Sequence, residues 1–563
     1  MTTDHGYPAV RMHIAGEWCQ GGTGRTAPIV NPATEEVIGY VPLATGADLD
    51  RALDAAAEGF RTWRDTPVAR RTEILHTAAD LLTERAVAVG RIMTLEQGKP
   101  LAEATGEARR VADTLRWHAD DARRAYGRII PSAPGTLLSV RREPIGPVAA
   151  FVPWNFPAGG PMRKISSALS AGCSIVIKAS EETPATAAAL VGCFEDAGLP
   201  AGVLNLVFGE PAEVSAQLIA SPVTRLVAFT GSVPVGKLLA AAAGKVMKPS
   251  LMELGGHAPV IVCSDADPAV AARRAARAKF ANAGQVCTSP SRFLVHENLV
   301  EDFTAEFVKA AEAVVVGDGL AEGTTMGPLA NERRMRAMRR LTADAVNRGA
   351  TVRTGGERLD RAGYFYAPTV LTDVPADADL MREEPFGPIA PIVPFTDLDE
   401  ALATANELPY GLAAYGFTES AATAERLVRE LEAGILSLNH CGGSVSEAPS
   451  RRRQGERLRQ GGRAGGPGRL PGHQARLPSA GGLRRHEVHQ GRRRRPGCVG
   501  TRGGDGHRAV VRVPDRRRPH RARHGAAGHR DLAARRRPAR VLRGRPQLPA
   551  AHRACRRRDA CPP

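Results

Sequence analysis

The composition of the chain changes abruptly at residue 451, and this change limits the part of the chain that can fold. Residues 451–563 contain 33 Arg, no Lys and six acidic residues, and they lack Ile, Phe, Tyr, Asn, Met and Trp altogether. This segment therefore carries a net charge of +27, whereas residues 1–450 carry −10, from 43 basic and 53 acidic side chains. A segment with so few apolar residues and so much like charge cannot offset its ordering entropy by burial. We therefore expect a folded body of 450 residues followed by a disordered tail.

The body alternates strand and helix signals from about residue 145 onward. Short apolar runs at 148–152, 174–177, 203–207 and 225–229 predict buried strands, and each run is followed by a segment of helical character. Helices between successive strands require parallel crossover connections, which produce a doubly wound α/β sheet. A body of this length exceeds one ordinary core, so two or three domains are expected. Ligands of doubly wound sheets bind at the carboxyl ends of the strands.

Two short motifs carry candidate chemistry. Cys287 lies in residues 282–289, which read Asn-Ala-Gly-Gln-Val-Cys-Thr-Ser, and the small neighbours suggest an exposed nucleophile on a loop. Glu253 lies in residues 252–257, which read Met-Glu-Leu-Gly-Gly-His, and the paired glycines suggest a base at a strand end that a ligand can approach closely. A cysteine by itself is more often an inert core residue, so neither motif alone establishes a catalytic function.

Together the two motifs resemble the glutamate and cysteine signatures of the aldehyde dehydrogenase superfamily, and the resemblance extends over about residues 10–450. Among its members, the succinate-semialdehyde dehydrogenases are the most similar in pattern. The resemblance implies an α/β fold with a Rossmann-type cofactor domain, an α/β catalytic domain, a β oligomerisation arm and a homo-oligomer. The implied parts are a cofactor domain (1–127 and 147–255), an arm (128–146), a catalytic domain (256–436) and the remnant of an oligomerisation segment (437–450).

A second group of glycines follows the run at 225–229. Gly231, Ser232 and Gly236 lie where a strand ends and a helix begins, and glycine there permits a pyrophosphate to approach helix N-terminal N–H groups. The spacing is not the usual dinucleotide fingerprint, and an ordinary turn is the alternative. The segment is similar to the variant phosphate loop of aldehyde dehydrogenases, which implies that these three residues bind a nicotinamide cofactor.

Two further segments resemble cofactor sites of the family. Lys178 and Glu181 follow a strand and resemble the adenosine-ribose site, where a carboxylate accepts from a 2′-hydroxyl and repels a 2′-phosphate. This pattern favours NAD over NADP, although adjacent Glu182 also fits a solvated charged turn. Glu384 and Phe386, in Glu-Pro-Phe-Gly-Pro, resemble the motif that holds the nicotinamide ribose, with Glu384 on its hydroxyls and Phe386 near the ring.

Asn155 follows the strand at 148–152, in the segment Pro-Trp-Asn-Phe-Pro. A side-chain amide can donate to developing oxyanion charge, whereas an Asn beside prolines can also be a plain turn residue. The resemblance implies the oxyanion role, with the Cys287 N–H as second donor and Trp154 at the cofactor. It further implies that Cys287 attacks the aldehyde, that the thiohemiacetal is oxidised to a thioester as NAD is reduced, and that Glu253 activates water for hydrolysis.

Three residues are candidates for substrate binding. Arg163 opens the helix after the Asn155 loop and Arg292 follows Cys287 by five residues, as arginines do in relatives that handle succinate semialdehyde. A guanidinium there would pair with a remote carboxylate, and Ser446 lies in a loop that also contacts substrate in those relatives. Solvated arginines and a 2-oxoglutarate semialdehyde substrate are the alternatives. The chain departs from redox-regulated relatives because no second cysteine lies close to Cys287 in sequence.

Targeting and metal signals are sparse. The N-terminus has no apolar signal region, and no apolar run approaches membrane-spanning length. Six body cysteines show no paired spacing, which favours a reducing cytoplasm, and the sparse histidines predict no metal site.

The tail has the composition that GC-rich DNA encodes when it is read out of frame. Residues 451–462 can be written in codons that, read one base later, encode Gly-Gly-Val-Lys-Glu-Ser-Gly-Tyr-Gly-Arg-Glu, similar to the family's closing motif. The same shift lets residues 472–474 encode Val-Thr-Lys, as expected of the family's last strand. We interpret the tail as a frameshift product beginning near Ser450. In the family, the segment after residue 450 supplies a strand that pairs with the arm. The frameshift would therefore leave the arm without its strand partner.

Three other readings of the altered C-terminus stay open. An inactive or poorly assembled enzyme is the main alternative to an active one. The tail can also be an evolved basic segment rather than a frameshift product. Such a segment could bind nucleic acid through phosphates, although His is the only aromatic residue type in the tail and the body is acidic.

Overall fold

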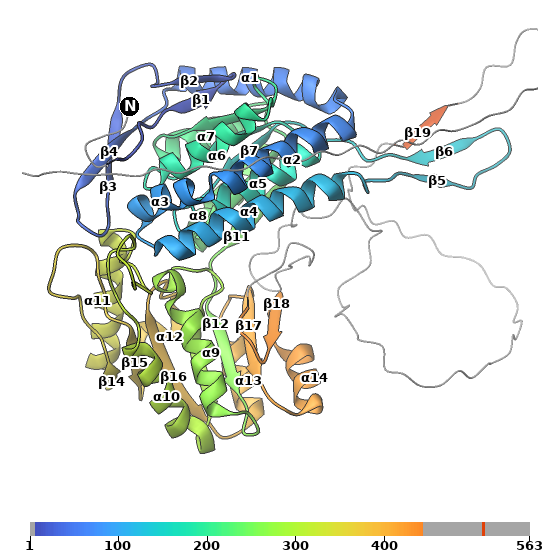
Figure 1. The fold of residues 1–563 in the computed structure, drawn as a ribbon. Helices are drawn as coiled ribbons and strands as arrows, with labels where there is room; N and C mark the ends of the chain where they lie inside the picture. Colours follow the sequence, from blue (N-terminus) through green and yellow to red (C-terminus); the bar gives the residue numbers. More distant parts are fainter. Residues whose placement is uncertain (1–5, 443–508, 513–563) are drawn as a thin grey trace, which may run out of the picture.

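The computed structural model describes residues 6–442 and 509–512. Two seven-stranded sheets form the body, and a narrow hairpin projects from it (Figure 1). The first sheet is built from strands before residue 255 and the second from strands after residue 257. The rest of the predicted tail and Ser446 lie outside the described residues.

The first sheet has the strand order β11-β10-β7-β8-β9-β1-β2. Its strands are β1 (Met12–Ile14), β2 (Glu17–Cys19), β7 (Val148–Phe151), β8 (Ile175–Lys178), β9 (Leu204–Val207), β10 (Leu226–Gly231) and β11 (Ser250–Leu254). The five strands from β11 to β9 are parallel, and β1 and β2 continue the sheet antiparallel. All residues of β7, β8 and β9 are buried, as expected of parallel strands covered on both faces, so the four strands predicted from apolar runs are confirmed.

Helices cover both faces of the first sheet. They are α1 (Gly46–Asp65), α2 (Val68–Glu84), α3 (Ala86–Gln97), α4 (Leu101–Ala122), α5 (Gly159–Ser170), α6 (Pro184–Asp196), α7 (Pro211–Ala220) and α8 (Val233–Lys245). Helix α7 contacts both α1 and α8, whereas α5 and α6 carry α2, α3 and α4 as an outer layer. Local signals fix several helix ends: Thr45 and Asp48 form a capping box at α1, and Gly98 ends α3 with a φ of 91°.

The second sheet has the strand order β14-β15-β16-β13-β12-β17-β18. Its strands are β12 (Ala258–Val262), β13 (Pro290–His296), β14 (Thr351–Thr354), β15 (Thr369–Thr372), β16 (Ile389–Phe395), β17 (Ala413–Phe417) and β18 (Ile435–Leu438). Its helices are α9 (Pro268–Phe280), α10 (Val300–Glu312), α11 (Glu332–Asn347), α12 (Asp379–Arg382), α13 (Leu398–Asn406) and α14 (Ala421–Glu430), with short 3-10 turns at Ala281–Gly284 and Glu297–Leu299. Every strand pair except β14–β15 is parallel. The sheet extends to Leu438, two residues beyond the predicted end of the catalytic domain.

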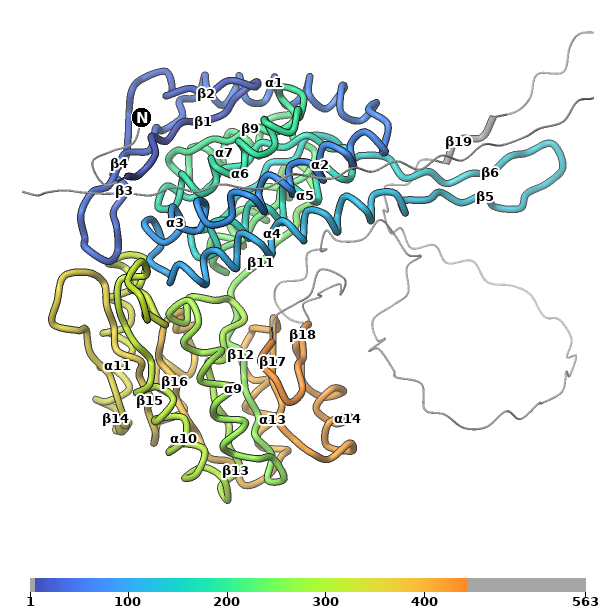
Figure 2. The backbone as a smooth tube through the Cα atoms, in the orientation of Figure 1, coloured from blue at the N-terminus to red at the C-terminus, as the bar shows by residue number. Residues whose placement is uncertain are grey.

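The projecting hairpin is formed by β5 (Arg128–Ile130) and β6 (Leu137–Val140), and a separate two-stranded sheet pairs β3 (Thr26–Val30) with β4 (Val37–Pro42). The hairpin stands clear of the body in the backbone trace (Figure 2). Strand β19 (Ala509–Arg512) pairs antiparallel with β6, so the prediction that this arm has no strand partner is wrong. Strand pairing uses backbone N–H and C=O groups, which any non-proline segment carries. The exposed edge of β6 can therefore pair with a segment of the Arg-rich tail.

No helix in residues 6–442 or 509–512 is long and apolar enough to cross a membrane.

Candidate active site

The strand order of the first sheet places a ligand crevice beside β7. The chain runs from β7 through β8 to β9 on one side and returns to β10 on the other side. The loops after β7 and β10 therefore diverge, and a doubly wound sheet binds its ligand at this point. Asn155 follows β7, and Gly231 ends β10.

The loop that carries Cys287 connects α9 to β13 through a tight left-handed turn. Asn282, Ala283 and Gly284 have φ angles of 49°, 51° and 71°. A Cβ atom on Gly284 would lie 2.2 Å from the carbonyl oxygen of Gly387, so only glycine fits between the two backbones. The Cys287 side chain that emerges from this turn is half-buried.

Gln285 holds this loop from inside. Its buried side-chain oxygen accepts from the Ala330 N–H at 3.0 Å, and its Nε2 donates to the Asn282 carbonyl at 3.2 Å. Buried polar groups with this many partners fix a backbone, because leaving any one of them unpaired is costly. The loop is therefore held rigidly two residues before the thiol.

Asn155 connects the first sheet to the Cys287 loop. Its side chain is buried, and Nδ2 donates to the Gln285 carbonyl at 3.0 Å. Its own carbonyl oxygen accepts from Nδ2 of Asn282 at 2.9 Å. This bond joins residues that are 130 positions apart, so Asn155 does more than shape a local turn. The structure thus brings a side-chain amide donor to the loop of the predicted nucleophile.

Paired glycines let the Glu253 segment approach both Cys287 and Glu384. Glu253 lies half-buried in β11. A Cβ on Gly256 would lie 3.1 Å from the Cys287 carbonyl oxygen, and one on Gly255 would lie 2.1 Å from a carboxylate oxygen of Glu384. The Gly256 N–H donates to Glu384 Oε1 at 3.1 Å. The three predicted site residues therefore belong to segments in mutual contact.

Phe386 is held in a strained backbone conformation beside Trp154. Its φ is 44°, which is rare for a bulky side chain and is typical of functional sites. The two rings meet edge to face, with centroids 5.7 Å apart. The Arg334 guanidinium lies 5.7 Å from the Phe386 ring centroid and donates to the Pro385 carbonyl, and burial lowers the pKa of Arg334 to about 10.

Lys178 and Glu181 form an ion pair at the end of β8, with 2.6 Å between Nζ and Oε2. The Lys178 side chain is 8% exposed, so the alternative of a solvated charged turn is wrong. The other Glu181 oxygen accepts from the Gly209 N–H at 3.0 Å. Glu182 instead binds the start of α11 through Asn331 and Arg333, and burial raises the pKa of Glu182.

The start of α8 has the features of an anion site. Ser232 is the N-cap residue and its side chain makes no capping hydrogen bond, so it does not occupy the N–H groups of the first turn, where an anion can bind. A Cβ on Gly236 would lie 2.3 Å from a methyl group of Leu254, so Gly236 permits close packing of α8 on β11. These groups, with a carboxylate at β8 and an aromatic pair near β7, fit a nicotinamide dinucleotide.

The structure describes two of the three predicted substrate residues, Arg163 and Arg292, and places them in different surroundings. Arg163 is exposed on α5. Arg292 is 1% exposed, and its guanidinium donates to the carbonyls of Thr404 and Ala405 at 2.9 Å and to Glu407 at 3.3 Å. The predicted substrate role of Arg292 is therefore not supported, because its donors already cap the C-terminus of α13. Burial lowers the pKa of Arg292 to about 10.

Sequence reasoning missed a buried ion pair next to Asn155. Lys99 and Glu107 have side chains that are 0% and 3% exposed, and Lys99 Nζ lies 2.6 Å from Glu107 Oε2. Nothing in the linear pattern pairs them, because Lys99 lies between two helices and Glu107 lies within the second. A lysine between Gly98 and Pro100 at a helix junction was the only available signal.

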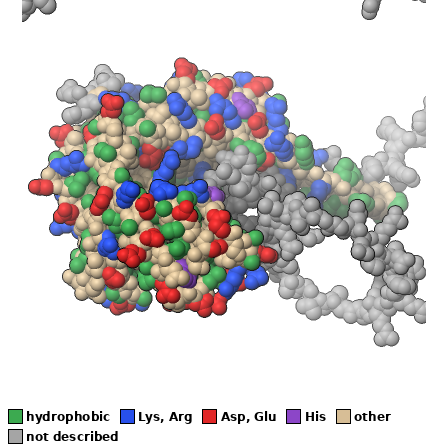
Figure 3. Space-filling model, turned by 60° about the horizontal axis from the view of Figure 1, so that its bottom comes forward, with side chains coloured by type: hydrophobic (Ala, Val, Ile, Leu, Met, Phe, Trp, Pro, Cys, Tyr) green, Lys and Arg blue, Asp and Glu red, His purple; other side chains and the backbone are tan. Residues whose placement is uncertain are grey.

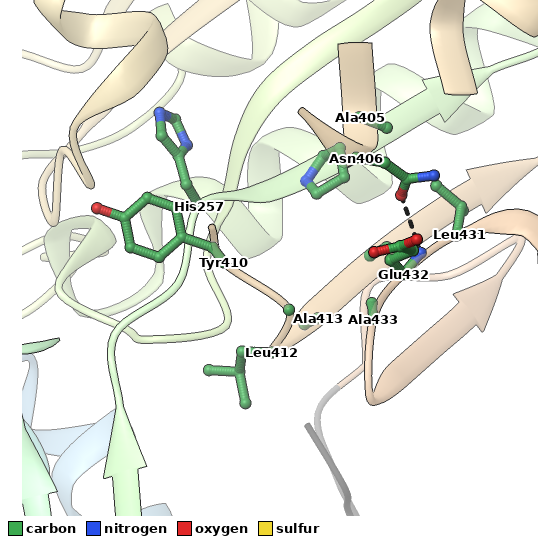
Figure 4. Close-up of a pocket in the computed structure, with 12 residues that line it drawn as sticks. His257, Ala405, Asn406, Tyr410, Leu412, Ala413, Leu431, Glu432 and Ala433 are labelled. Atoms are coloured by element: carbon green, nitrogen blue, oxygen red, sulfur yellow. Dashed lines mark hydrogen bonds between the residues drawn. The ribbon is translucent and has the colours of Figure 1, made fainter. Parts of the chain in front are cut away.

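A small pocket lies near the start of β12, with a cavity of about 10 Å³ (Figure 4). His257 and Tyr410 line it, and their ring centroids are 6.2 Å apart. His257 bonds to Ser291 Oγ at 2.7 Å and to the Leu380 carbonyl at 3.0 Å, and burial holds the pKa of His257 well below its usual value. The pocket is too small for an aldehyde, so we assign His257 a structural role.

A doubly wound sheet whose strand ends contact a loop that carries a cysteine fits an oxidoreductase that binds a dinucleotide. The model of the aldehyde dehydrogenase family matches residues 18–467, and the chain belongs to that family.

Similar proteins agree with this assignment. The chain is 48% identical over 444 residues to a 4-(hydroxymethyl)benzenesulfonate dehydrogenase of Comamonas testosteroni, covering 79% of this chain and 92% of that protein. It is 40% identical to the NADP-dependent succinate-semialdehyde dehydrogenase of Escherichia coli, covering 76% and 89%. The solved structure of an aldehyde dehydrogenase from Bacillus cereus in complex with NAD+ has a TM-score of 0.77 at 34% identity, covering 79% and 91%.

Proposed function

We propose that the protein oxidises an acidic aldehyde to the carboxylic acid with NAD as the acceptor. The observation that carries this proposal is the contact of Asn155 with Gln285, which brings an amide donor to the Cys287 loop. The Glu253 segment reaches the same loop through Gly256. The proposed oxyanion donor and base thus come from two segments that each contact the loop of the proposed nucleophile.

The proposed reaction begins when the Cys287 thiolate adds to the aldehyde carbon and forms a thiohemiacetal. Asn155 Nδ2 and the Cys287 N–H donate to the oxygen on which negative charge develops. The chemistry that a bound nicotinamide dinucleotide supplies is acceptance of a hydride, which leaves a thioester on Cys287. Glu253 then takes a proton from water, the resulting hydroxide adds to the thioester carbonyl, and the Cys287 thiolate leaves as the acid forms.

Glu181 supports NAD as the preferred cofactor. Its carboxylate is fixed by Lys178 and by the Gly209 N–H at the end of β8, where an adenosine ribose would lie. A fixed carboxylate accepts from a 2′-hydroxyl and repels a 2′-phosphate. The E. coli relative is named for NADP, whereas the B. cereus structure holds NAD+, so the family accommodates both cofactors.

The names of the relatives support an aldehyde that carries a second, anionic group. The two named relatives act on a benzenesulfonate and on succinate semialdehyde, which bear a sulfonate and a carboxylate. Lys and Arg side chains gather along a hollow on one face of the molecule (Figure 3), and a basic rim favours anionic ligands. We propose a short semialdehyde such as succinate semialdehyde, with Arg163 as the candidate partner of its remote carboxylate and Ser446 as a further contact. 2-Oxoglutarate semialdehyde is the nearest competitor.

The Cys287→Ala variant tests the reaction. Turnover of succinate semialdehyde, followed as reduced cofactor, should fall below detection because no thiohemiacetal can form, while NAD binding by calorimetry stays within about twofold. Cys19→Ala is the matched control, since Cys19 is a half-buried thiol on β2 whose sulfur accepts from the Arg51 guanidinium at 3.1 Å. Turnover by Cys287→Ala at the rate of the Cys19→Ala control would contradict the assignment.

We also propose that the chain after residue 450 is encoded out of frame and that the in-frame protein is a homo-oligomer built through the arm. The alignment with the Comamonas relative covers 444 of the 563 residues yet 92% of that relative, which supports this view. Sequencing the DNA around codon 450 tests it directly. Absence of the family's closing motif from the neighbouring reading frame after codon 450 would contradict the frameshift.

A further inference from the structure

We propose that Lys99, paired with Glu107, is a positioning residue that holds Asn155 in register with the Cys287 loop. The proposal rests on the proposed function, because it assumes that Asn155 donates to the oxyanion. The pair is completely enclosed, with side chains 0% and 3% exposed.

The Lys99 ammonium touches the Asn155 segment twice. Nζ donates to the Asn155 carbonyl oxygen at 3.1 Å and to Glu107 Oε2 at 2.6 Å. It also lies 4.6 Å from the centroid of the Phe156 ring, which is the next residue along the chain. The ammonium therefore has three partners, two of which belong to the loop after β7.

Glu107 fixes the other end of the same loop. Its Oε1 accepts from the N–H groups of Ala158 at 3.0 Å and Gly159 at 2.9 Å, where α5 begins. A carboxylate at a helix N-terminus satisfies donors that the helix itself leaves open. One ion pair thus holds the loop at its start through Asn155 and at its end through Gly159.

The same segment also reaches the Cys287 loop. Gln97 Nε2 donates to Asn282 Oδ1 at 2.8 Å, and the Lys99 N–H donates to Gln97 Oε1 at 3.1 Å. Asn282 in turn donates to the carbonyl of Asn155. Residues 97–99 therefore set the spacing between the loop of the amide donor and the loop of the thiol.

Stability alone does not explain an ion pair in this place. Replacing a buried pair by apolar residues of similar volume is often neutral or stabilising, because desolvation offsets the attraction between the charges. Catalysis is far more sensitive to position, since a displacement of about 1 Å can lower the rate about a hundredfold. The pair as a whole should therefore matter more to turnover than to folding, whereas removal of one charge alone also destabilises the fold.

A double-mutant cycle tests whether Lys99 acts through Asn155. The cycle is measured in the full chain with succinate semialdehyde and NAD. Lys99→Met should lower kcat about 30- to 100-fold while Asn155 is present, with the KM for NAD within about twofold. In the Asn155→Ala background the same change should lower kcat less than about threefold, because the donor it positions is already gone. Ser174→Ala is the control: it removes a buried bond to the Ala56 carbonyl at 2.6 Å and should act equally in both backgrounds.

Each result decides the inference. An equal fall in kcat in both backgrounds, or no fall, would show that Lys99 does not act through Asn155. If Asn155→Ala leaves kcat unchanged while Cys287→Ala abolishes turnover, the positioning role fails and the thiol chemistry stands. If Lys99→Met does not fold, Glu107→Gln takes its place, since the amide oxygen can still accept from residues 158 and 159 while the charge pair is lost. A cycle through Glu107→Gln with no coupling to Asn155 would equally overturn the proposal.

Discussion

The two seven-stranded sheets share one architecture but present opposite edges to the candidate site. In the first sheet, Asn155, Lys178, Gly231 and Glu253 lie at or just after the carboxyl ends of parallel strands. In the second sheet the site residues precede their strands, with Cys287 before β13 and the Glu384 segment before β16.

The difference shows what each sheet supplies. Carboxyl ends of a doubly wound sheet expose helix N-termini and diverging loops, which suit a dinucleotide. Helix C-termini lie at the amino ends of the strands, and their negative dipole ends do not attract a phosphate. The second sheet supplies a nucleophile on a rigid turn instead. The carboxyl-end rule for doubly wound sheets therefore predicts the first half of the site and not the second.

The largest predicted effect in this comparison concerns Arg292. This residue lies near the amino end of β13, but its guanidinium binds the end of α13. Arg292→Met should lower the free energy of unfolding by about 2–3 kcal/mol, since the last carbonyls of α13 lose charged donors, and leave the KM for an acidic aldehyde unchanged. Chemical denaturation and steady-state kinetics measure the two effects.

Arg163→Met is the matched control for Arg292. Arg163 is exposed, so its replacement should change stability by less than about 0.5 kcal/mol and raise the KM for an acidic aldehyde. If the KM for an acidic aldehyde rose only in the Arg292 variant, Arg292 in the second sheet would be the substrate-binding arginine.

Lys279 should make the stability of the second sheet depend on pH. It is fully buried, its Nζ has no hydrogen-bond partner among the described residues, and burial lowers the pKa of Lys279 to about 7. Between pH 7 and 10.5 the unfolded chain binds a proton at Lys279 that the folded chain does not, so this residue makes stability rise with pH across that window.

Lys279→Met should therefore stabilise the protein by about 1–2 kcal/mol at pH 7, and the gain should shrink toward pH 10. Denaturation at several pH values measures it. A gain that stays constant with pH would mean that Lys279 does not titrate in this range.

Glu181 gives the smallest predicted effect, at the carboxyl edge of the first sheet. Glu181→Ser should raise kcat/KM for NADP relative to NAD about tenfold, because repulsion of a 2′-phosphate is removed. Glu213→Ser, an exposed change on α7, is the control and should leave the ratio alone. An unchanged ratio in the Glu181 variant would remove that carboxylate from the ribose site.

Several features of the fold were predictable because their signals are local. Short apolar runs predicted β7 to β10, since parallel strands covered on both faces must be apolar throughout. The Cys287 and Glu253 motifs predicted the family, which the family model confirms.

Other features depended on partners that are distant in sequence. The spacing of five residues between Cys287 and Arg292 suggested that Arg292 binds the substrate of Cys287. Its guanidinium instead donates to the last carbonyls of α13. The pairing of β19 with β6 was likewise invisible, because backbone hydrogen bonds carry no sequence signature.

The sequence by itself determined four buried strands of the first sheet, the break in composition at residue 451 and the two motifs that define the family. Each of these depends on a residue's own side chain or on neighbours within one turn. Only the tertiary structure decided which buried charges support the site. Lys99 and Glu107 lie 56 and 48 residues before Asn155, and their partnership with its loop exists only where three segments converge. A buried charge takes its role from the partners around it, and those partners are assembled by the fold.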